Sequence, residues 1–145
     1  MNKLLSAGTL LCLLAPLAGG CSNPDRDSLG QLFQQIEIEV TGKVRPQITN
    51  PTGQQRSITF FRDQARDAYI VADTFLNSGH RLTDGARENV VRFRDAEKRA
   101  YEYYDAFIQR EDFELSESEK AKGRELLDAA LGEMQKLVER LDRKR

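Results

Sequence analysis

The side chains that most often carry catalysis or bind metals are few in this sequence and do not form a known catalytic pattern. The single histidine, His80, follows Asn77-Ser78-Gly79 in a stretch that predicts a turn. A carboxylate-bridged di-iron bundle needs Glu-x-x-His pairs from two helices, which one histidine cannot supply. A serine nucleophile would need a histidine base, and no Gly-x-Ser-x-Gly pattern is present. The sequence therefore predicts no catalytic residue, no metal site and no cofactor.

Carboxylates are abundant, and paired carboxylates could in principle cleave glycosidic bonds. The chain has 23 Asp and Glu residues, and nearly all of them stand beside Arg or Lys on the polar sides of predicted helices. This arrangement is typical of solvated helix faces that carry salt bridges. We therefore expect a protein that is not an enzyme.

One aromatic cluster is unusual for a simple helical bundle. Tyr101, Tyr103, Tyr104 and Ile108, together with Phe107, spread over more of a helix than a single buried stripe. Phenol rings have an apolar body and a polar tip, and they are enriched where proteins bind partners. We predict that Tyr101, Tyr103, Tyr104 and Ile108 line the edge of a partner-binding groove. The alternative is that Tyr104 and Phe107 are core residues and that Tyr101 and Tyr103 cover a neighbouring helix.

The periodicity of the apolar residues predicts the elements that would hold this cluster. Apolar residues recur every three or four positions in four segments, which predicts helices over residues 28–44, 57–77, 84–109 and 117–143. Predicted N-terminal caps are Asp27 or Ser28, Ser57, Thr83 or Asp84, and a capping box over Ser116-Glu117-Ser118-Glu119. Gly79 predicts a helix stop, and Pro46 to Gln55 predict the longest loop. Together these features predict an all-α fold, an antiparallel four-helix bundle.

The end of the first predicted element is ambiguous. Residues Ile36 to Thr41 alternate apolar and polar side chains and include β-branched residues, a pattern that also suits a half-buried strand. We favour a helix and keep the strand as the alternative.

Length and charge limit the class of protein. With 145 residues, 39% of them hydrophobic, the chain is expected to form one small domain. Lys and Arg number 22 against 23 acidic residues, which gives a net charge of -1. Because nucleic-acid binding needs a concentrated basic excess, we expect no nucleic acid among the partners.

The N-terminus reads as an export signal. A positive charge at Lys3 precedes an apolar and small-residue stretch from Leu4 to Leu17, which predicts a cleaved signal peptide over residues 1–20. The stretch is short for a membrane-spanning helix. Leu17-Ala18-Gly19-Gly20-Cys21 resembles the lipobox of bacterial lipoproteins. The resemblance implies lipidation of Cys21 and, because Ser22 follows it, an outer-membrane location on the periplasmic side. The inner membrane and the cell surface are the alternatives.

This interpretation leaves residues 21–27 as a lipidated tether of about 20 Å reach and residues 28–145 as a single helical domain. Cys21 would be the only cysteine of the processed chain, so no internal disulfide is expected. We expect a lipid-anchored, non-enzymatic interaction or scaffold domain for an envelope partner protein. The alternative function is a domain that binds or senses a small ligand in a pocket between the helices.

Overall fold

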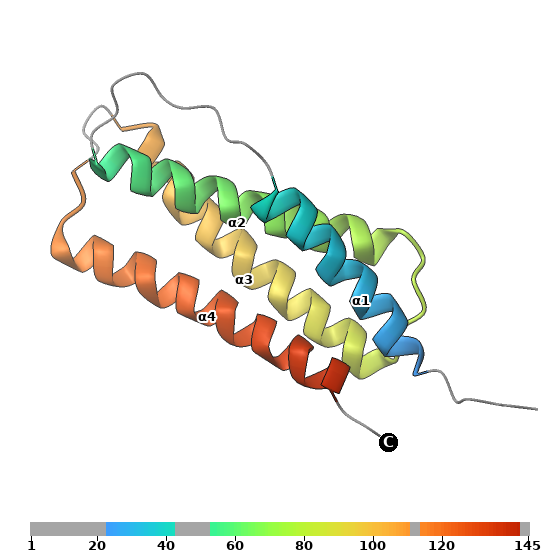
Figure 1. The fold of residues 1–145 in the computed structure, drawn as a ribbon. Helices are drawn as coiled ribbons and strands as arrows, with labels where there is room; N and C mark the ends of the chain where they lie inside the picture. Colours follow the sequence, from blue (N-terminus) through green and yellow to red (C-terminus); the bar gives the residue numbers. More distant parts are fainter. Residues whose placement is uncertain (1–22, 43–52, 111–113, 143–145) are drawn as a thin grey trace, which may run out of the picture.

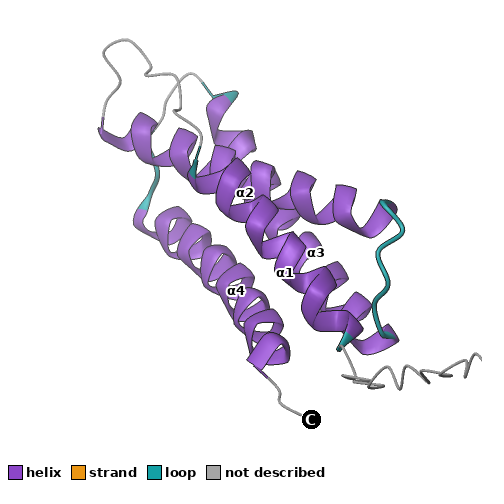
Figure 2. Ribbon diagram, turned by 45° about the vertical axis from the view of Figure 1, so that its right-hand side comes forward, coloured by secondary structure: helices purple, strands orange, loops and turns teal. Residues whose placement is uncertain are grey.

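The computed structural model describes residues 23–42, 53–110 and 114–142. Its elements are the helices α1 (Pro24–Ile36), α2 (Gly53–Asn77), α3 (Asp84–Ile108) and α4 (Glu117–Asp142), and a π-helix, η1 (Glu37–Thr41), that continues α1. The four helices pack side by side with alternating directions (Figure 1). All the regular structure of the described ranges is helical (Figure 2). The predicted all-α helical bundle is therefore confirmed.

Helix α1 begins at Pro24, earlier than the predicted start at residue 28. Asn23 is the N-cap, and its side-chain oxygen accepts a hydrogen bond from the backbone N–H of Asp25 at 3.2 Å. Pro24 occupies the first helical position, where its fixed φ and missing N–H suit a helix start. Asp27 and Ser28, the predicted caps, lie inside the helix, so the predicted tether of residues 21–27 is too long.

The strand alternative for residues 36–41 is wrong. These residues continue α1 and then form η1, which ends at Thr41, three residues before the predicted helix end. Ile36 and Val40 are buried, whereas Ile38 is 57% exposed. A β-strand needs a neighbouring strand to satisfy its backbone, and the described part of the chain offers none.

Helix α2 also begins before its predicted start. It starts at Gly53, so Ser57 is an interior helical residue rather than a cap. Gln54, Gln55 and Arg56 have good helix propensity and no proline follows Pro51 in this stretch, which lets the helix extend backwards. The last three residues of the predicted loop, Gly53 to Gln55, therefore belong to α2, and its remaining residues lie outside the described ranges.

The other helix boundaries agree with the sequence to within one residue. Thr83 caps α3, because its hydroxyl oxygen accepts a hydrogen bond from Ala86 N at 3.3 Å. The capping box of α4 is reciprocal: Ser116 N donates to Glu119 Oε2 at 2.8 Å, and Glu119 N donates to Ser116 Oγ at 3.3 Å. Gly79 ends α2 with a φ of 76°, a left-handed conformation that favours glycine.

The buried side chains form two hydrophobic cores along the bundle. The first core, at the end that holds α1, consists of Leu29, Leu32, Ile36, Val40, Ala68, Val71, Ala72, Phe75, Leu76, Val90, Phe93 and Leu137. The second core, at the other end, consists of Ile58, Tyr104 and Phe107, with Phe61, Tyr103, Ile108, Leu115 and Leu127 packed against it. Since η1 ends at Thr41 and α2 runs on well beyond it, α1 covers only the first core.

Candidate partner-binding surface

The structure gathers most of the predicted tyrosine cluster in the second core. Tyr104 is only 4% exposed, and its ring centroid lies 5.5 Å from that of Phe61. Tyr103 is half-buried, and its hydroxyl donates a hydrogen bond to the backbone oxygen of Glu119 at 2.8 Å. Burial raises the pKa of both phenols. Ile108 is partly buried against the same core. These three side chains join α2, α3 and α4.

Tyr101 lies apart from that packing. It is partly buried and does not belong to either core. Of the predicted site residues, the partly buried Tyr101, Tyr103 and Ile108 present surface that a partner could touch, whereas Tyr104 would have to leave the core first. Partner binding by this cluster remains a prediction.

Helix α4 exposes part of its apolar face. Leu127, Leu131, Met134, Val138 and Leu141 follow one another at alternating spacings of four and three, the spacing of a helix-packing seam. Leu127, Met134 and Leu141 are partly buried against the two cores. Leu131 and Val138 are 56% and 41% exposed. The bundle thus leaves one edge of the α4 apolar face uncovered.

The other flank of α4 faces α3. A Cβ atom on Gly85 of α3 would lie 3.5 Å from Cζ of Arg140, so the Arg140 side chain reaches directly onto α3. Leu131 and Val138 share one side of α4, because they are seven residues apart. Arg140 lies nearly opposite to them around the helix axis, so they face away from the contact of Arg140 with α3. We call these two exposed residues, Leu131 and Val138, the α4 stripe.

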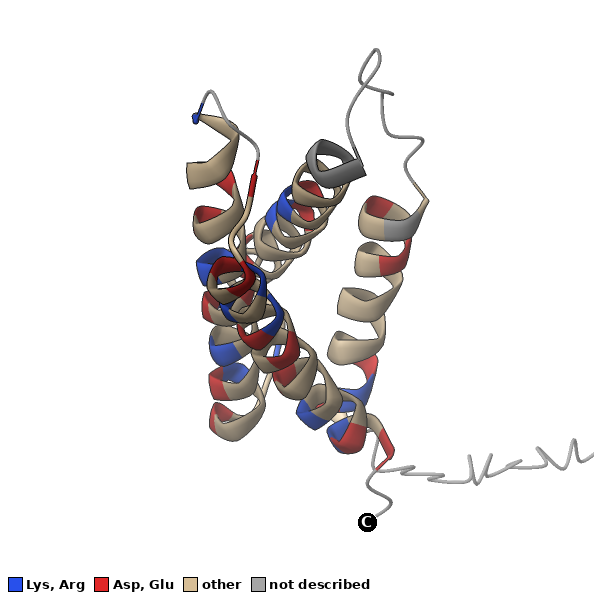
Figure 3. Cartoon of the chain, turned by 90° about the vertical axis from the view of Figure 1, so that its left-hand side faces the viewer, with Lys and Arg blue, Asp and Glu red and all other residues tan. Residues whose placement is uncertain are grey.

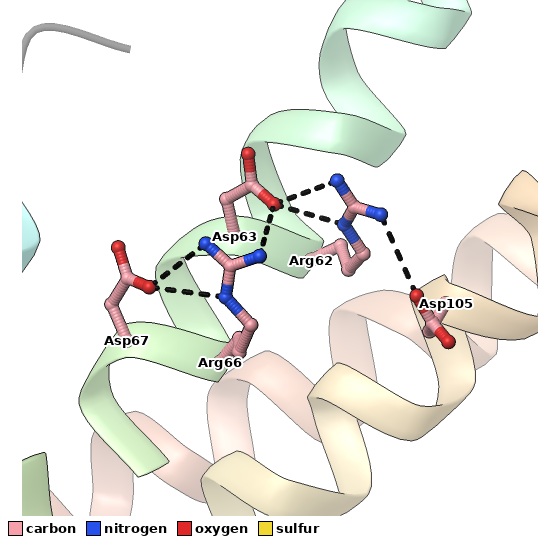
Figure 4. Close-up of polar contacts among 5 residues, drawn as sticks. All are labelled: Arg62, Asp63, Arg66, Asp67 and Asp105. Carbon is pink, nitrogen blue, oxygen red and sulfur yellow. Dashed lines mark hydrogen bonds and ion pairs between the residues drawn. The ribbon is translucent and has the colours of Figure 1, made fainter. Parts of the chain in front are cut away.

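The acidic and basic side chains of α2 form a network of ion pairs (Figure 4). Arg62 lies 2.8 Å from Asp63 and 3.5 Å from Asp105 of α3. Arg66 lies 3.6 Å from Asp63 and 3.1 Å from Asp67, whose carboxylate is almost fully buried. These distances describe charge pairing between and along helices rather than a pair of free carboxylates. Basic and acidic residues are interspersed along the described helices (Figure 3).

An open cleft of about 350 Å³ lies between α1–η1 and α2. It is lined by Gln35, Glu39, Asp67, Ile70, Val71 and Thr74. None of the predicted tyrosines lines it. Four of the six lining residues are polar or charged, and the other two, Ile70 and Val71, are apolar.

The described ranges contain no group of three or more His, Cys, Asp or Glu side chains positioned to bind a metal ion. His80 lies after α2, where its ring stacks on Phe75 with a centroid distance of 4.2 Å. Among the described helices, none has the length and apolar character needed to cross a membrane.

Comparison with known proteins places no relative beside this chain: no protein-family model, curated protein or solved structure matches it.

Proposed function

We propose that this protein is a lipoprotein anchored through Cys21 in the outer membrane, and that its helical bundle is a non-enzymatic interaction or scaffold domain for an envelope partner protein. The anchor rests on the resemblance of residues 17–21 to a lipobox. The interaction role rests chiefly on the exposed α4 stripe.

The early start of α1 supports a bundle held close to the membrane. Only Ser22 separates Cys21 from the N-cap Asn23, and a chain of that length spans at most about 7 Å. Asp25 and Ser28 of α1 hydrogen-bond to Thr83 and Arg81, so the turn between α2 and α3 lies at the same end. A lipid on Cys21 would hold this end at the lipid headgroups and direct the second core away from the membrane.

The α4 stripe favours a protein partner. Leu131 and Val138 stand seven residues apart on one flank, and half-buried Met134 lies between them along the stripe. An amphipathic helix of the partner could pack its own apolar seam on this flank, as in helix-in-groove recognition. The near balance of 22 basic and 23 acidic residues further supports a protein partner rather than nucleic acid.

Site-specific photo-crosslinking in intact cells tests this proposal. A photoreactive amino acid at Leu131 or Val138 of the full chain should give one discrete adduct with another envelope protein. The same amino acid at Ile70, which is 49% exposed but lies in the cleft beside α1, is the matched control and should not give that adduct. Adduct formation at Ile70 but not on the stripe, or only adducts between two copies of this chain, would contradict the proposal.

The cleft between α1–η1 and α2 supports a second candidate function, the binding of a small ligand. A ligand that binds only the folded state raises the melting temperature, and the rise grows with the logarithm of the ligand concentration once that exceeds the dissociation constant. Replacing Thr74, an exposed residue of the cleft lining, with a larger residue such as Phe should abolish that rise for a ligand of this cleft. The test compares the melting temperature of the full chain in the absence and in the presence of each of a set of small envelope metabolites.

A further inference from the structure

The start of α1 and the end of α4 lie at the same end of the bundle (Figure 1). Asp25 of α1 accepts a hydrogen bond from Thr83, the N-cap of α3, at 2.8 Å. Arg140, in the last turn of α4, reaches Gly85 at the start of α3. A lipid on Cys21 would hold the start of α1 at the headgroups, and it would therefore hold the end of α4 there as well.

The position of the α4 stripe along its helix then limits its distance from the membrane. Because an α-helix rises by about 1.5 Å per residue, Val138 and Leu131 lie about 6 Å and about 17 Å along α4 from its last residue, Asp142. The link from Cys21 to Asn23 adds at most about 7 Å. Even in a bundle that stands upright, the whole stripe stays within about 25 Å of the headgroups.

This distance leaves little room for a soluble partner domain. A domain of about 100 residues has a radius of gyration of about 13 Å. The midpoint of the stripe lies only about 11 Å along α4 from the helix end. A domain of that size centred on the stripe would reach the headgroups. A partner that is itself attached to the membrane meets no such conflict, because its binding segment already lies at this level.

The direction of α4 favours a partner helix that rises from the membrane. Leu131 and Val138 stand seven residues apart, and a seven-residue apolar repeat favours a partner helix packed at about 20° to α4. Since α4 runs towards the anchored end, such a helix points at the membrane as well (Figure 1). Beyond Val138 it reaches the level of the α4 end after about 6 Å, or about four residues. The segment that fits the stripe is therefore an amphipathic helix next to the partner's own membrane attachment.

A basic side chain lies on the same side of α4 as the stripe and further from the membrane. Arg124 is exposed and stands seven residues before Leu131. Its neighbour Lys122 pairs with Glu125 at 3.0 Å, whereas no carboxylate of the described residues forms an ion pair with Arg124. A carboxylate of the partner helix would supply that charge. A second copy of this chain would not, because two anchored copies related by a twofold axis along the membrane normal bring Arg124 against Arg124.

We propose that the partner is a membrane-attached protein whose amphipathic helix rises from its attachment along α4, covers Leu131 and Val138 with apolar side chains and places a carboxylate against Arg124. This inference rests on the lipid anchor and the partner-binding role proposed above. The short link between Cys21 and α1 then holds the stripe at the height of the partner helix.

A spacer between Ser22 and Asn23 of the full chain tests this height, with the photoreactive amino acid at Leu131 in intact cells. About ten prolines form a stiff link of about 31 Å and move the stripe away from the headgroups. The adduct yield, relative to the amount of acylated chain, should fall at least about tenfold. The same prolines added after Arg145 leave the link to the lipid unchanged, so this matched control should keep the yield.

The charge of the partner helix is tested at Arg124. Arg124→Glu places like charges together and should lower the adduct yield at Leu131 at least about fivefold. Arg99→Glu is the matched control: Arg99 is also exposed and forms no ion pair with the described residues, but it lies on α3. This variant should keep the yield. Circular dichroism checks the fold of both variants.

The protein found in the adduct should itself remain with the membranes when cells that lack this chain are fractionated. The inference is overturned by a partner recovered in the soluble fraction, by a yield that the proline spacer leaves unchanged, or by an unchanged yield in Arg124→Glu. Each of these results leaves the partner-binding role standing, whereas the absence of any adduct from the chain without a spacer contradicts that role itself.

The proline spacer has a substitute. If it prevents labelling of the chain with a palmitate analogue, about four Glu-Ala-Ala-Ala-Lys repeats replace it, because they form a largely helical spacer of about 30 Å. The expected loss of the adduct and the contradicting result are the same.

Discussion

At the scale of single residues, Gly123 determines how closely α3 and α4 approach. It is buried in the interior of α4 directly against the ring of Tyr104. A Cβ atom at this position would lie 2.9 Å from Cζ of Tyr104 and 3.4 Å from Cε1 of Tyr103. The first of these distances is shorter than carbon atoms tolerate, so the second core requires glycine here although glycine weakens a helix.

We expect Gly123→Ala to lower the free energy of unfolding by about 1–3 kcal/mol, because overpacking outweighs the better helix propensity of alanine. Gly132→Ala on the same helix is the control. A Cβ atom there meets nothing within 4 Å, so the free energy of unfolding should rise by up to about 1 kcal/mol. Chemical denaturation of the full chain measures both. Equal stabilisation by the two substitutions would show that α3 and α4 are not in close contact at Gly123.

At the scale of elements, the short helix α1 is attached to the bundle by a buried carboxylate as well as by its apolar face. Asp25 accepts hydrogen bonds from both the backbone N–H and the hydroxyl of Thr83, each at 2.8 Å. Thr83 in turn caps α3. Ser28 donates a hydrogen bond to the backbone oxygen of Arg81 at 2.8 Å. The beginning of α1 is thereby joined to the beginning of α3.

Asp25→Ala should lower the free energy of unfolding by about 1–3 kcal/mol, since it leaves two donors of Thr83 without their acceptor. Asp27→Ala is the matched control: Asp27 is exposed in the first turn of the same helix, so both changes lose a similar interaction with the helix dipole. The two variants are compared by denaturant unfolding, and the difference between their free energies of unfolding gives the contribution of the contact with Thr83. No difference between them would contradict a role for Asp25 in holding α1.

At the scale of the whole molecule, the proposed membrane attachment is a lipid on Cys21. Each buried methylene of an acyl chain contributes about 0.8 kcal/mol, and two or three chains anchor a protein stably. Metabolic labelling with a palmitate analogue, followed by membrane fractionation, should therefore label the wild-type chain and recover it with membranes.

Cys21→Ser should lose both the label and the membrane association. Cys12→Ser, which changes the other cysteine and lies in the predicted signal peptide, should keep both. Equal labelling of the wild-type and Cys21→Ser chains would refute the lipid anchor, and the bundle would then require another explanation for its location.

The sequence predicts the helix boundaries correctly where the apolar periodicity and the capping residues agree. The Ser116–Glu119 capping box and the Thr83 cap are local interactions between residues three apart, so they form as soon as a helix starts there. The starts of α1 and α2 were placed too late because the apolar stripe begins inside each helix, after a polar first turn. The Asn23-Pro24 pair is the local signal that could have placed the start of α1 correctly.

The sequence by itself determined the helical class, the four amphipathic segments and most of their ends, because these depend on contacts within a few residues. Tertiary structure decided which apolar side chains are covered. It buried Tyr104 in the second core and left Leu131 and Val138 exposed on one side of α4. Burial depends on the length and angle of neighbouring helices, and periodicity along one helix carries no information about either.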